Sequence, residues 1–172
     1  MLTRLNHIEH KIVDHKEALQ RVKMWRLKGQ KVVFTNGCFD ILHRGHVTYL
    51  AQTAEKGNRL IVALNTDSSV KRQGKGEERP INQEDARAMV LASLGFVDMV
   101  IFFDEDTPLT AIKLLQPDVL AKGADYDADE TDENAKAYIV GSKEVRTYGG
   151  SVVAIPLVEG FSTTAIIKKL KD

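Results

Sequence analysis

The 172-residue sequence has few of the features that place a chain in a special class. It holds a single cysteine, Cys38, so an intrachain disulfide is excluded and a reducing compartment is expected. No apolar run approaches the roughly 18 residues that a membrane span requires. The 24 Lys and Arg residues balance the 24 Asp and Glu residues, so no charge excess points to nucleic acid or to an acidic membrane surface. We therefore expect a cytoplasmic protein whose partners include neither nucleic acid nor a membrane.

Two common nucleotide-binding motifs are also absent. There is no Gly-x-x-x-x-Gly-Lys-Ser/Thr loop, and Gly74-x-Gly76 is followed by Arg79 where a dinucleotide fingerprint needs glycine. These absences argue against a Walker-type ATPase and a nicotinamide dehydrogenase. The N-terminus has no apolar segment, so we expect no secretory signal. The length, with 43% hydrophobic and 28% charged residues, suits one globular domain.

Apolar runs alternate with amphipathic stretches along the chain. The predicted strands are residues 31–35, 59–65, 97–103, 118–122 and 151–156. The predicted helices are residues 14–28, 46–56, 82–94 and 108–115, with a short last helix after residue 162. This alternation predicts an α/β, Rossmann-like fold: a parallel five-stranded sheet with helices on both faces. Such a sheet binds ligands at the carboxyl ends of its strands.

Local signals refine this outline. Asn82 is expected to cap a helix, with Asp85 in a capping-box-like contact, and Pro108 to open a helix at its first position. The polar stretch 67–80 predicts a mobile basic loop, and the acidic stretch 124–137 predicts a solvated loop that runs into a helix. Residues 1–29 are expected to form an N-terminal helical extension, and residues 30–172 the domain that carries the sheet.

The most informative stretch is Thr35-Asn36-Gly37-Cys38-Phe39-Asp40-Ile41-Leu42-His43-Arg44-Gly45-His46. It joins the first predicted strand to a helix start, where unpaired backbone N–H groups and the helix dipole favour anions. The histidine pair has three interpretations. They are metal ligands, which would need further ligands; residues that cap a helix; or hydrogen-bond donors to a phosphate.

The third interpretation is the one that carries a family resemblance. Gly37-Cys38-Phe39-Asp40 followed by His43-x-Gly45-His46 resembles the signature of the nucleotidyltransferase superfamily, which includes cytidylyltransferases and pantetheine-phosphate adenylyltransferase. Further stretches resemble the heptose 1-phosphate adenylyltransferases of the ADP-heptose pathway. They are residues 64–72, Arg79-Pro80-Ile81-Asn82, Lys122-Gly123-Ala124-Asp125-Tyr126, residues 141–145 and residues 159–164. One departure is Ala124, where that family has glycine. The activity occurs in that family either fused to a kinase half or free-standing. The chain has no room for a kinase half, so we expect the free-standing form.

The resemblance implies transfer of the adenylyl group of ATP to D-glycero-D-manno-heptose 1-phosphate, with Mg²⁺ held mainly through phosphates and a homodimer as the assembly. Lipopolysaccharide precursor synthesis is the implied pathway, and residues 30–172 become the nucleotidyltransferase domain. The implied catalytic residues are His43, His46 and Lys71, with no protein metal site. The implied ATP-binding residues are Thr35, Asn36, Gly37, Cys38, Phe39, Asp40, Gly45, Lys122, Ser162, Thr163 and Thr164. The implied substrate-binding residues are Asn65, Asp67, Arg79, Arg87 and Asp125.

Some of these residues also have structural interpretations. Asp40 is expected at the ribose, or as a loop-orienting acceptor of backbone N–H groups. Lys71 is expected to bridge the two phosphates, or to be a solvated charge, and Arg87 to contact phosphate or to pair with Glu84. Three other functions stay open: a cytidylyltransferase acting on a small phosphorylated alcohol, a non-catalytic nucleotide-binding module and a zinc-binding module.

Overall fold

The computed structural model describes residues 3–74, 76 and 78–171 of the chain. Its strands are β1 (Val32–Gly37), β2 (Arg59–Asn65), β3 (Met99–Phe103), β4 (Val119–Gly123) and β5 (Ser151–Ile155). Its helices are α1 (Arg4–Glu9), α2 (His15–Leu27), α3 (Arg44–Ala54), α4 (Asp67–Arg72), α5 (Glu84–Ser93), α6 (Leu109–Leu115), α7 (Ser142–Thr147) and α8 (Thr163–Lys171).

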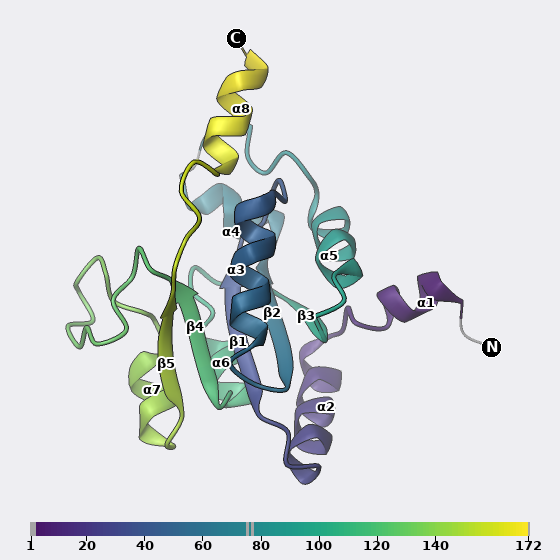
Figure 1. Ribbon diagram of the computed structural model, residues 1–172, viewed down its shortest axis with the longest axis vertical. Helices are drawn as coiled ribbons and strands as arrows, with labels where there is room; N and C mark the ends of the chain where they lie inside the picture. Colours follow the sequence, from purple (N-terminus) through teal and green to yellow (C-terminus); the bar gives the residue numbers. More distant parts are fainter. Residues whose placement is uncertain (1–2, 75, 77, 172) are drawn as a thin grey trace.

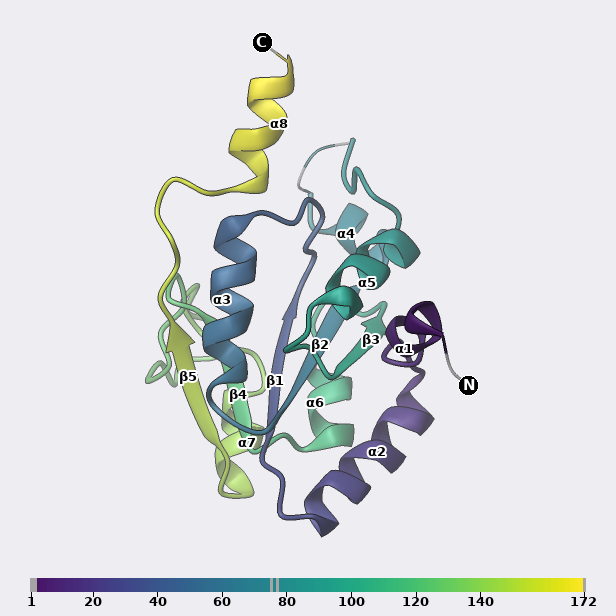
Figure 2. The same cartoon turned by 45° about the vertical axis from the view of Figure 1, so that its right-hand side comes forward.

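The strands form one sheet in the order β3-β2-β1-β4-β5, and every neighbouring pair is parallel (Figure 1). Helices α3 and α5 cover one face, and α2, α6 and α7 cover the other (Figure 2). The predicted Rossmann-like α/β fold is therefore confirmed. The strand order reverses between β1 and β4, which makes the carboxyl ends of these two strands the expected ligand-binding edge.

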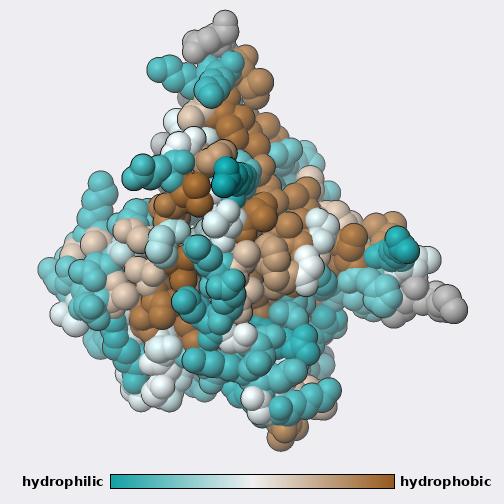
Figure 3. All heavy atoms as spheres, in the orientation of Figure 1, coloured by the Kyte–Doolittle hydropathy of each residue, from teal (hydrophilic) through white to brown (hydrophobic). Residues whose placement is uncertain are grey.

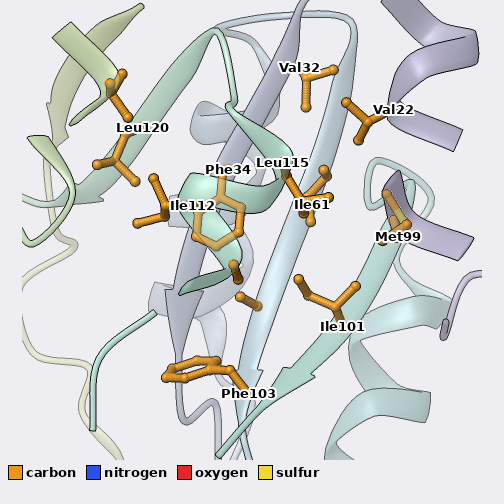
Figure 4. Close-up of a cluster of buried hydrophobic side chains, with 14 of the residues drawn as sticks. Val22, Val32, Phe34, Ile61, Met99, Ile101, Phe103, Ile112, Leu115 and Leu120 are labelled. Atoms are coloured by element: carbon orange, nitrogen blue, oxygen red, sulfur yellow. The ribbon is translucent and has the colours of Figure 1, made fainter. Parts of the chain in front are cut away.

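The core lies on both faces of the sheet because alternate residues of a strand point to opposite sides. In β1, Phe34 packs on one face and Val33 on the other. Figure 4 shows Phe34 of β1 in one cluster with Ile61 of β2, Ile101 of β3, and Ile112 and Leu115 of α6. Burial on both faces explains why the strands read as continuous apolar runs.

The N-terminal residues pack on this same core. Ala18 and Val22 of α2 are fully buried in the cluster around Phe34, and Trp25 is partly buried against it. The backbone N–H of Val13 donates to the Val100 carbonyl (3.0 Å), and that of Val100 donates to the Lys11 carbonyl (2.8 Å). The outer edge of β3 is thus paired rather than open to another chain. The boundary expected at residues 29 and 30 stays a prediction.

Several local predictions need correction. Residues 67–72 form helix α4 rather than a loop, because Thr66 caps it by accepting a hydrogen bond from the Ser69 backbone; Lys75 and Glu77 of the expected loop lie outside the described residues. Helix α5 begins at Glu84 after Gln83, and the Asn82 side chain instead donates to the Asp40 carbonyl (2.6 Å). Helix α3 begins at Arg44, two residues before the predicted start, and Pro108 is the N-cap of α6 rather than its first residue.

Helix α8 projects from the rest of the molecule in both ribbon views (Figures 1 and 2). The acidic stretch after β4 is a loop with turns that leads to α7, as predicted. None of the helices in the described residues has the length and apolar character to cross a membrane.

Candidate active site

A cavity of about 520 Å³ opens at the carboxyl ends of β1 and β4, between the first turns of α3 and α8. This is the edge that the strand order designates. Most of the predicted ATP-binding and catalytic residues line it: Asn36, Gly37, Cys38, Phe39, Asp40, His43, Gly45, His46, Lys122, Ser162, Thr163 and Thr164. Arg79 and Asp125, predicted to bind substrate, line it as well.

The two histidines are held together at the start of α3. His43 is the N-cap residue, and its Nδ1 accepts a hydrogen bond from the His46 backbone N–H (3.3 Å). The two rings are stacked, with centroids 3.8 Å apart and planes at 17°. A Cβ atom on Gly45 would stand 3.1 Å from the His43 ring and 3.0 Å from Phe161, so only glycine leaves both side chains in place. Capping and ligand binding are therefore compatible roles for His43.

Both imidazoles are kept uncharged by their surroundings. Burial, with a smaller contribution from His43, lowers the pKa of His46 to about 4, although a hydrogen bond with the Ile41 backbone opposes the shift. Burial also lowers the pKa of His43. Nδ1 of His46 is buried and has no hydrogen-bond partner among the described residues. A ligand that brings negative charge would raise the pKa of these imidazoles, and the protonated rings could then donate hydrogen bonds to its oxygens.

The opposite wall of the cavity is the start of α8. Ser162 Oγ accepts a hydrogen bond from the Ala165 backbone N–H (3.0 Å), so Ser162 caps this helix. Phe161 joins the two walls, because its ring lies 6.4 Å from the His43 ring and 5.6 Å from the Arg44 guanidinium carbon. Two helix starts thus converge on one cavity, each with unpaired backbone N–H groups that favour phosphate oxygens.

Asp40 has a buried structural role. Its carboxylate accepts hydrogen bonds from Arg79 Nε (2.5 Å) and from the backbone N–H groups of Ile81 (3.0 Å) and Asn82 (2.9 Å). These bonds fasten the loop after β1 to the segment before α5. Asp40 therefore orients the cavity wall, as one of its two interpretations required.

Lys122 and Thr35 act at the floor of the site. Lys122 Nζ donates to the Asn36 carbonyl (3.2 Å) and to Asn36 Oδ1 (3.0 Å), and lies 5.2 Å from the centre of the Tyr126 ring. Thr35 is fully buried, and its hydroxyl is 2.7 Å from that of Tyr49. Thr35 thus supports the floor and is not one of the cavity-lining residues.

Other predicted residues lie away from this cavity. Arg87 is buried, and its guanidinium donates to the carbonyls of Asn82, Cys38 and Asn65 and to Asp67 Oδ1 rather than pairing with Glu84. Because these bonds engage Arg87 and Asp67 with each other and with the backbone, the structure gives them a positioning role. Asn65 lines a second cavity, and Lys71 is exposed on α4 outside both cavities.

Sequence reasoning missed several residues of the site. Phe161, Tyr49 and Tyr126 line the main cavity. Phe161 and Tyr126 lay inside stretches that carried the resemblance, but nothing in their spacing distinguished contact from packing. Tyr49 follows His46 by three residues, which places both on one face of α3.

Metal-binding groups are sparse at the site. Over the described residues, no cluster of three or more His, Cys, Asp and Glu side chains is arranged to hold a metal ion. The zinc-binding alternative therefore finds no third ligand for His43 and His46 there. Asp40 is engaged by Arg79 and the backbone, and Asp125 is the other carboxylate that lines the cavity. Asp125 is therefore the carboxylate that could contact Mg²⁺, a cation that keeps several waters and rarely has an all-protein cage.

Comparisons with known proteins agree with this geometry. A family model described as cytidylyltransferase-like matches residues 34–169. The chain is 51% identical over 160 residues to the bifunctional protein HldE of Magnetococcus marinus, covering 93% of this chain and 31% of that protein. It is 54% identical over 166 residues to the bifunctional protein HldE of Campylobacter concisus, covering 96% and 32%. The chain thus spans about a third of the length of these curated relatives.

Similar solved structures include the following two. One is titled a lipopolysaccharide core biosynthesis protein from Thermoplasma volcanium; the TM-score is 0.57 and the identity 27%, over 76% of this chain and 98% of that one. The other is a pantoate-beta-alanine ligase from Francisella tularensis, with a TM-score of 0.59 and 16% identity over 93% of this chain and 76% of that one. The ligase shows a shared fold and no more.

Proposed function

Because this chain belongs to the cytidylyltransferase-like family, we propose that it transfers the adenylyl group of ATP to D-glycero-D-manno-heptose 1-phosphate. The products are ADP-heptose and pyrophosphate, and the pathway served is the synthesis of lipopolysaccharide precursors. The observation that carries the transferase assignment is the stacked pair of neutral imidazoles at the start of α3, opposite a second helix start.

The arrangement suits a nucleoside triphosphate because hydrogen-bond donors at the starts of α3 and α8 face its negative charges from two sides of the cavity. His43 and His46 donate hydrogen bonds to oxygens of the α- and β-phosphates, which gain negative charge in the transition state. The backbone N–H groups at the start of α8, with the hydroxyls of Thr163 and Thr164, receive the β- and γ-phosphates. The triphosphate would then lie across the cavity between the two helices.

The chemical step needs no protein nucleophile. A phosphate monoester is largely dianionic near neutral pH, since its second pKa is about 6. An oxygen of the sugar phosphate attacks the α-phosphorus; the new P–O bond forms as the bond to the β-phosphate bridging oxygen breaks, and pyrophosphate leaves with the electron pair. Catalysis is then positioning plus electrostatic stabilisation, so Cys38 need not react.

The heptose acceptor has separate support. The stretches at residues 64–72, 79–82, 122–126, 141–145 and 159–164 resemble heptose 1-phosphate adenylyltransferases, and one similar structure is titled a lipopolysaccharide core biosynthesis protein. Lys71 stays a predicted bridge between the two phosphates. Mg²⁺, held by the triphosphate with Asp125 nearby, would offset the charge of the phosphates.

Two further statements belong to this proposal. A cytoplasmic location is supported by a buried Cys38 thiol as the chain's single cysteine, which suits a reducing compartment. A homodimer is supported by exposed apolar side chains, among them Val90 of α5 and Leu170 of α8. Figure 3 shows apolar surface along α8 and over the middle of this face. Sedimentation equilibrium should then give twice the chain mass of 19.2 kDa.

A substrate panel tests the activity. The protein is incubated with Mg²⁺, each nucleoside triphosphate in turn, and heptose 1-phosphates of both anomers, with glycerol 3-phosphate and ethanolamine phosphate as competing acceptors. Mass spectrometry should find ADP-heptose with ATP. Product formation only from CTP and a small phosphorylated alcohol would replace the acceptor and the nucleotide in the proposal, and ATP binding with no pyrophosphate release from any pair would refute it.

A further inference from the structure

A chain of ring contacts connects the start of α3 with the start of α8. The rings of His46 and His43 are stacked 3.8 Å apart. The Phe161 ring lies 6.4 Å from the His43 ring with the two planes at 28°, and the Arg44 guanidinium carbon lies 5.6 Å from the centre of the Phe161 ring. The two histidines and Arg44 belong to the cap and first turn of α3, whereas Phe161 comes just before α8. Phe161 therefore carries the contact between the two elements.

The segment that leads from β5 to α8 has few other attachments. Among the described residues, no hydrogen bond joins residues 156–161 to the rest of the protein. Gly160 has φ +81°, a conformation that glycine adopts without strain. Helix α8 itself projects from the molecule, and Leu170 near its end is 78% exposed. The position of the α8 start relative to α3 therefore depends on side-chain contacts such as those of Phe161.

Phe161 has no place in the hydrophobic core. Its side chain is 41% exposed, and it belongs to neither cluster of buried residues. It is nevertheless packed closely against α3, because a Cβ atom on Gly45 would stand 3.0 Å from Phe161 Cβ. It also lines the main cavity. Its burial contributes little to folding, so its close contact with both walls of the cavity calls for another role.

Arg44 is placed to hold the Phe161 ring. It is exposed, and none of the ion pairs between described residues involves it. Arg44 is not one of the residues that line the main cavity. A guanidinium over the face of an aromatic ring is attracted by the negative charge of that face. The contact that the structure gives to the Arg44 side chain is therefore with Phe161.

We propose that Phe161, held by Arg44, is a positioning residue that sets the distance between the starts of α3 and α8, so that one triphosphate contacts both. This inference rests on the proposed function. A ligand held at two linked points binds more tightly than at either point alone, because the second contact forms at a high effective concentration. That gain is lost when the spacing of the two walls is not kept.

The first test compares a ligand that reaches both walls with one that reaches a single wall. ATP carries the triphosphate and AMP the α-phosphate alone, and both displace a fluorescent ATP analogue whose own affinity is measured for each variant. Phe161→Leu should weaken ATP binding about tenfold or more and AMP binding less than about twofold. Phe161→Tyr, which keeps the ring, should restore most of the ATP affinity. Leu27→Ala, an exposed apolar residue at the end of α2, is the control.

Each outcome of this test decides the role of Phe161. A selective loss of ATP affinity supports the positioning role, since general damage to the site would weaken AMP as well. Equal losses for ATP and AMP, or unchanged ATP affinity in Phe161→Leu, would overturn it.

The second test asks whether Arg44 acts through Phe161. Arg44→Met should weaken ATP binding about two- to fivefold, the scale of an exposed cation–π contact. The same change in the Phe161→Leu background should have no further effect, because the ring is already gone. Arg4→Met, at an exposed position of α1, is the control. A further loss in the double variant would mean that Arg44 contacts the phosphates directly, against the proposal. The single variant tests the inference even where Phe161→Leu fails to fold, because unchanged ATP affinity would refute the part of Arg44.

This inference and the proposed function fail in distinguishable ways. If the wild-type protein releases pyrophosphate from ATP and heptose 1-phosphate, and Phe161→Leu does so equally well with unchanged ATP affinity, the positioning role is wrong and the proposed function stands. If Phe161→Leu selectively loses ATP affinity while the wild-type protein releases no pyrophosphate from any pair, the positioning role stands and the proposed function is wrong.

Discussion

At the scale of single residues, His43 has two roles: it caps α3, and it positions the ring of His46. His43 caps α3 through its Nδ1 atom, and this cap stacks its ring on that of His46. Burial lowers the pKa of both rings, and His43 lowers that of His46 further, so in the unliganded protein both act as neutral hydrogen-bonding groups. Under the proposed function, the triphosphate would bring the negative charge that these rings meet.

Replacement of His46 tests its part in catalysis. His46→Ala should lower kcat by about 10²–10³, because one donor to the transition state is lost. Circular dichroism should show the fold retained, since the ring is an active-site group and not part of either hydrophobic cluster. The measurement is pyrophosphate release under saturating ATP and acceptor. Turnover near that of the wild-type protein would contradict the proposed mechanism.

The same histidine predicts a pH dependence of stability. Its pKa in the folded protein is about 4, below the ordinary 6.5, so between these values the unfolded chain binds a proton that the folded chain does not. The free energy of unfolding must therefore fall as the pH is lowered from about 6.5 to about 4. Urea denaturation of the wild-type protein and His46→Gln across this range should show a shallower fall in the variant. Parallel curves would mean that His46 titrates normally.

At the scale of elements, α2 is the helix whose membership in the domain is least evident from the sequence. Its hydrophobic residues face the sheet, and Ala18 and Val22 are fully buried beside β1 and β3. The family model begins only at residue 34, after this helix ends. The packing nevertheless makes α2 one of the layers that cover the sheet, with α6 and α7.

A conservative change in α2 tests whether residues 1–29 are a separate extension. Val22→Ala removes two buried carbons, and with the cavity left behind it should lower the free energy of unfolding by about 2 kcal/mol. The unfolding transition should stay single, because α2 and the sheet share one core. Lys23→Ala, at the exposed neighbouring position, serves as the control. A wild-type midpoint for Val22→Ala would indicate that α2 folds apart from the sheet.

At the scale of the whole molecule, Arg87 connects segments that the sequence separates widely. One guanidinium reaches the ends of β1 and β2 through the carbonyls of Cys38 and Asn65, and the start of α4 through Asp67. Arg87 and the Asp40–Arg79 pair together connect the loops at the carboxyl edge of the sheet. The geometry of the carboxyl edge therefore depends on two ion pairs, Arg87–Asp67 and Arg79–Asp40.

Loss of Arg87 should unfold the protein more readily. Arg87→Leu leaves three carbonyls and the Asp67 carboxylate without their donor, at a cost of about 3–5 kcal/mol. Chemical denaturation of this variant beside Arg44→Leu, an exposed arginine on α3, provides the comparison. Equal stability of the two variants would contradict this connecting role of Arg87.

The sequence by itself determined the strands of the sheet and the segment that forms the candidate active site. Apolar runs located all five strands within two residues at each end, and the strand–turn–helix motif at residues 35–46 located one wall of the main cavity. These features are local, because burial on both faces of a strand and the capping of a helix depend on residues that are close together in the sequence. The resemblance in the separated stretches agreed with the family to which the chain belongs.

Only the tertiary structure decided which of the distant charged residues connect loops and which face the cavity. Arg79, Arg87 and Asp40 are all charged residues near motif stretches, and nothing local separates a group that binds phosphate from one that holds two loops together. That difference depends on burial and on partners 20 to 49 residues away along the chain. The second cavity is likewise invisible in the sequence, because it forms only where the ends of three strands and the segments before α6 and α7 meet in space.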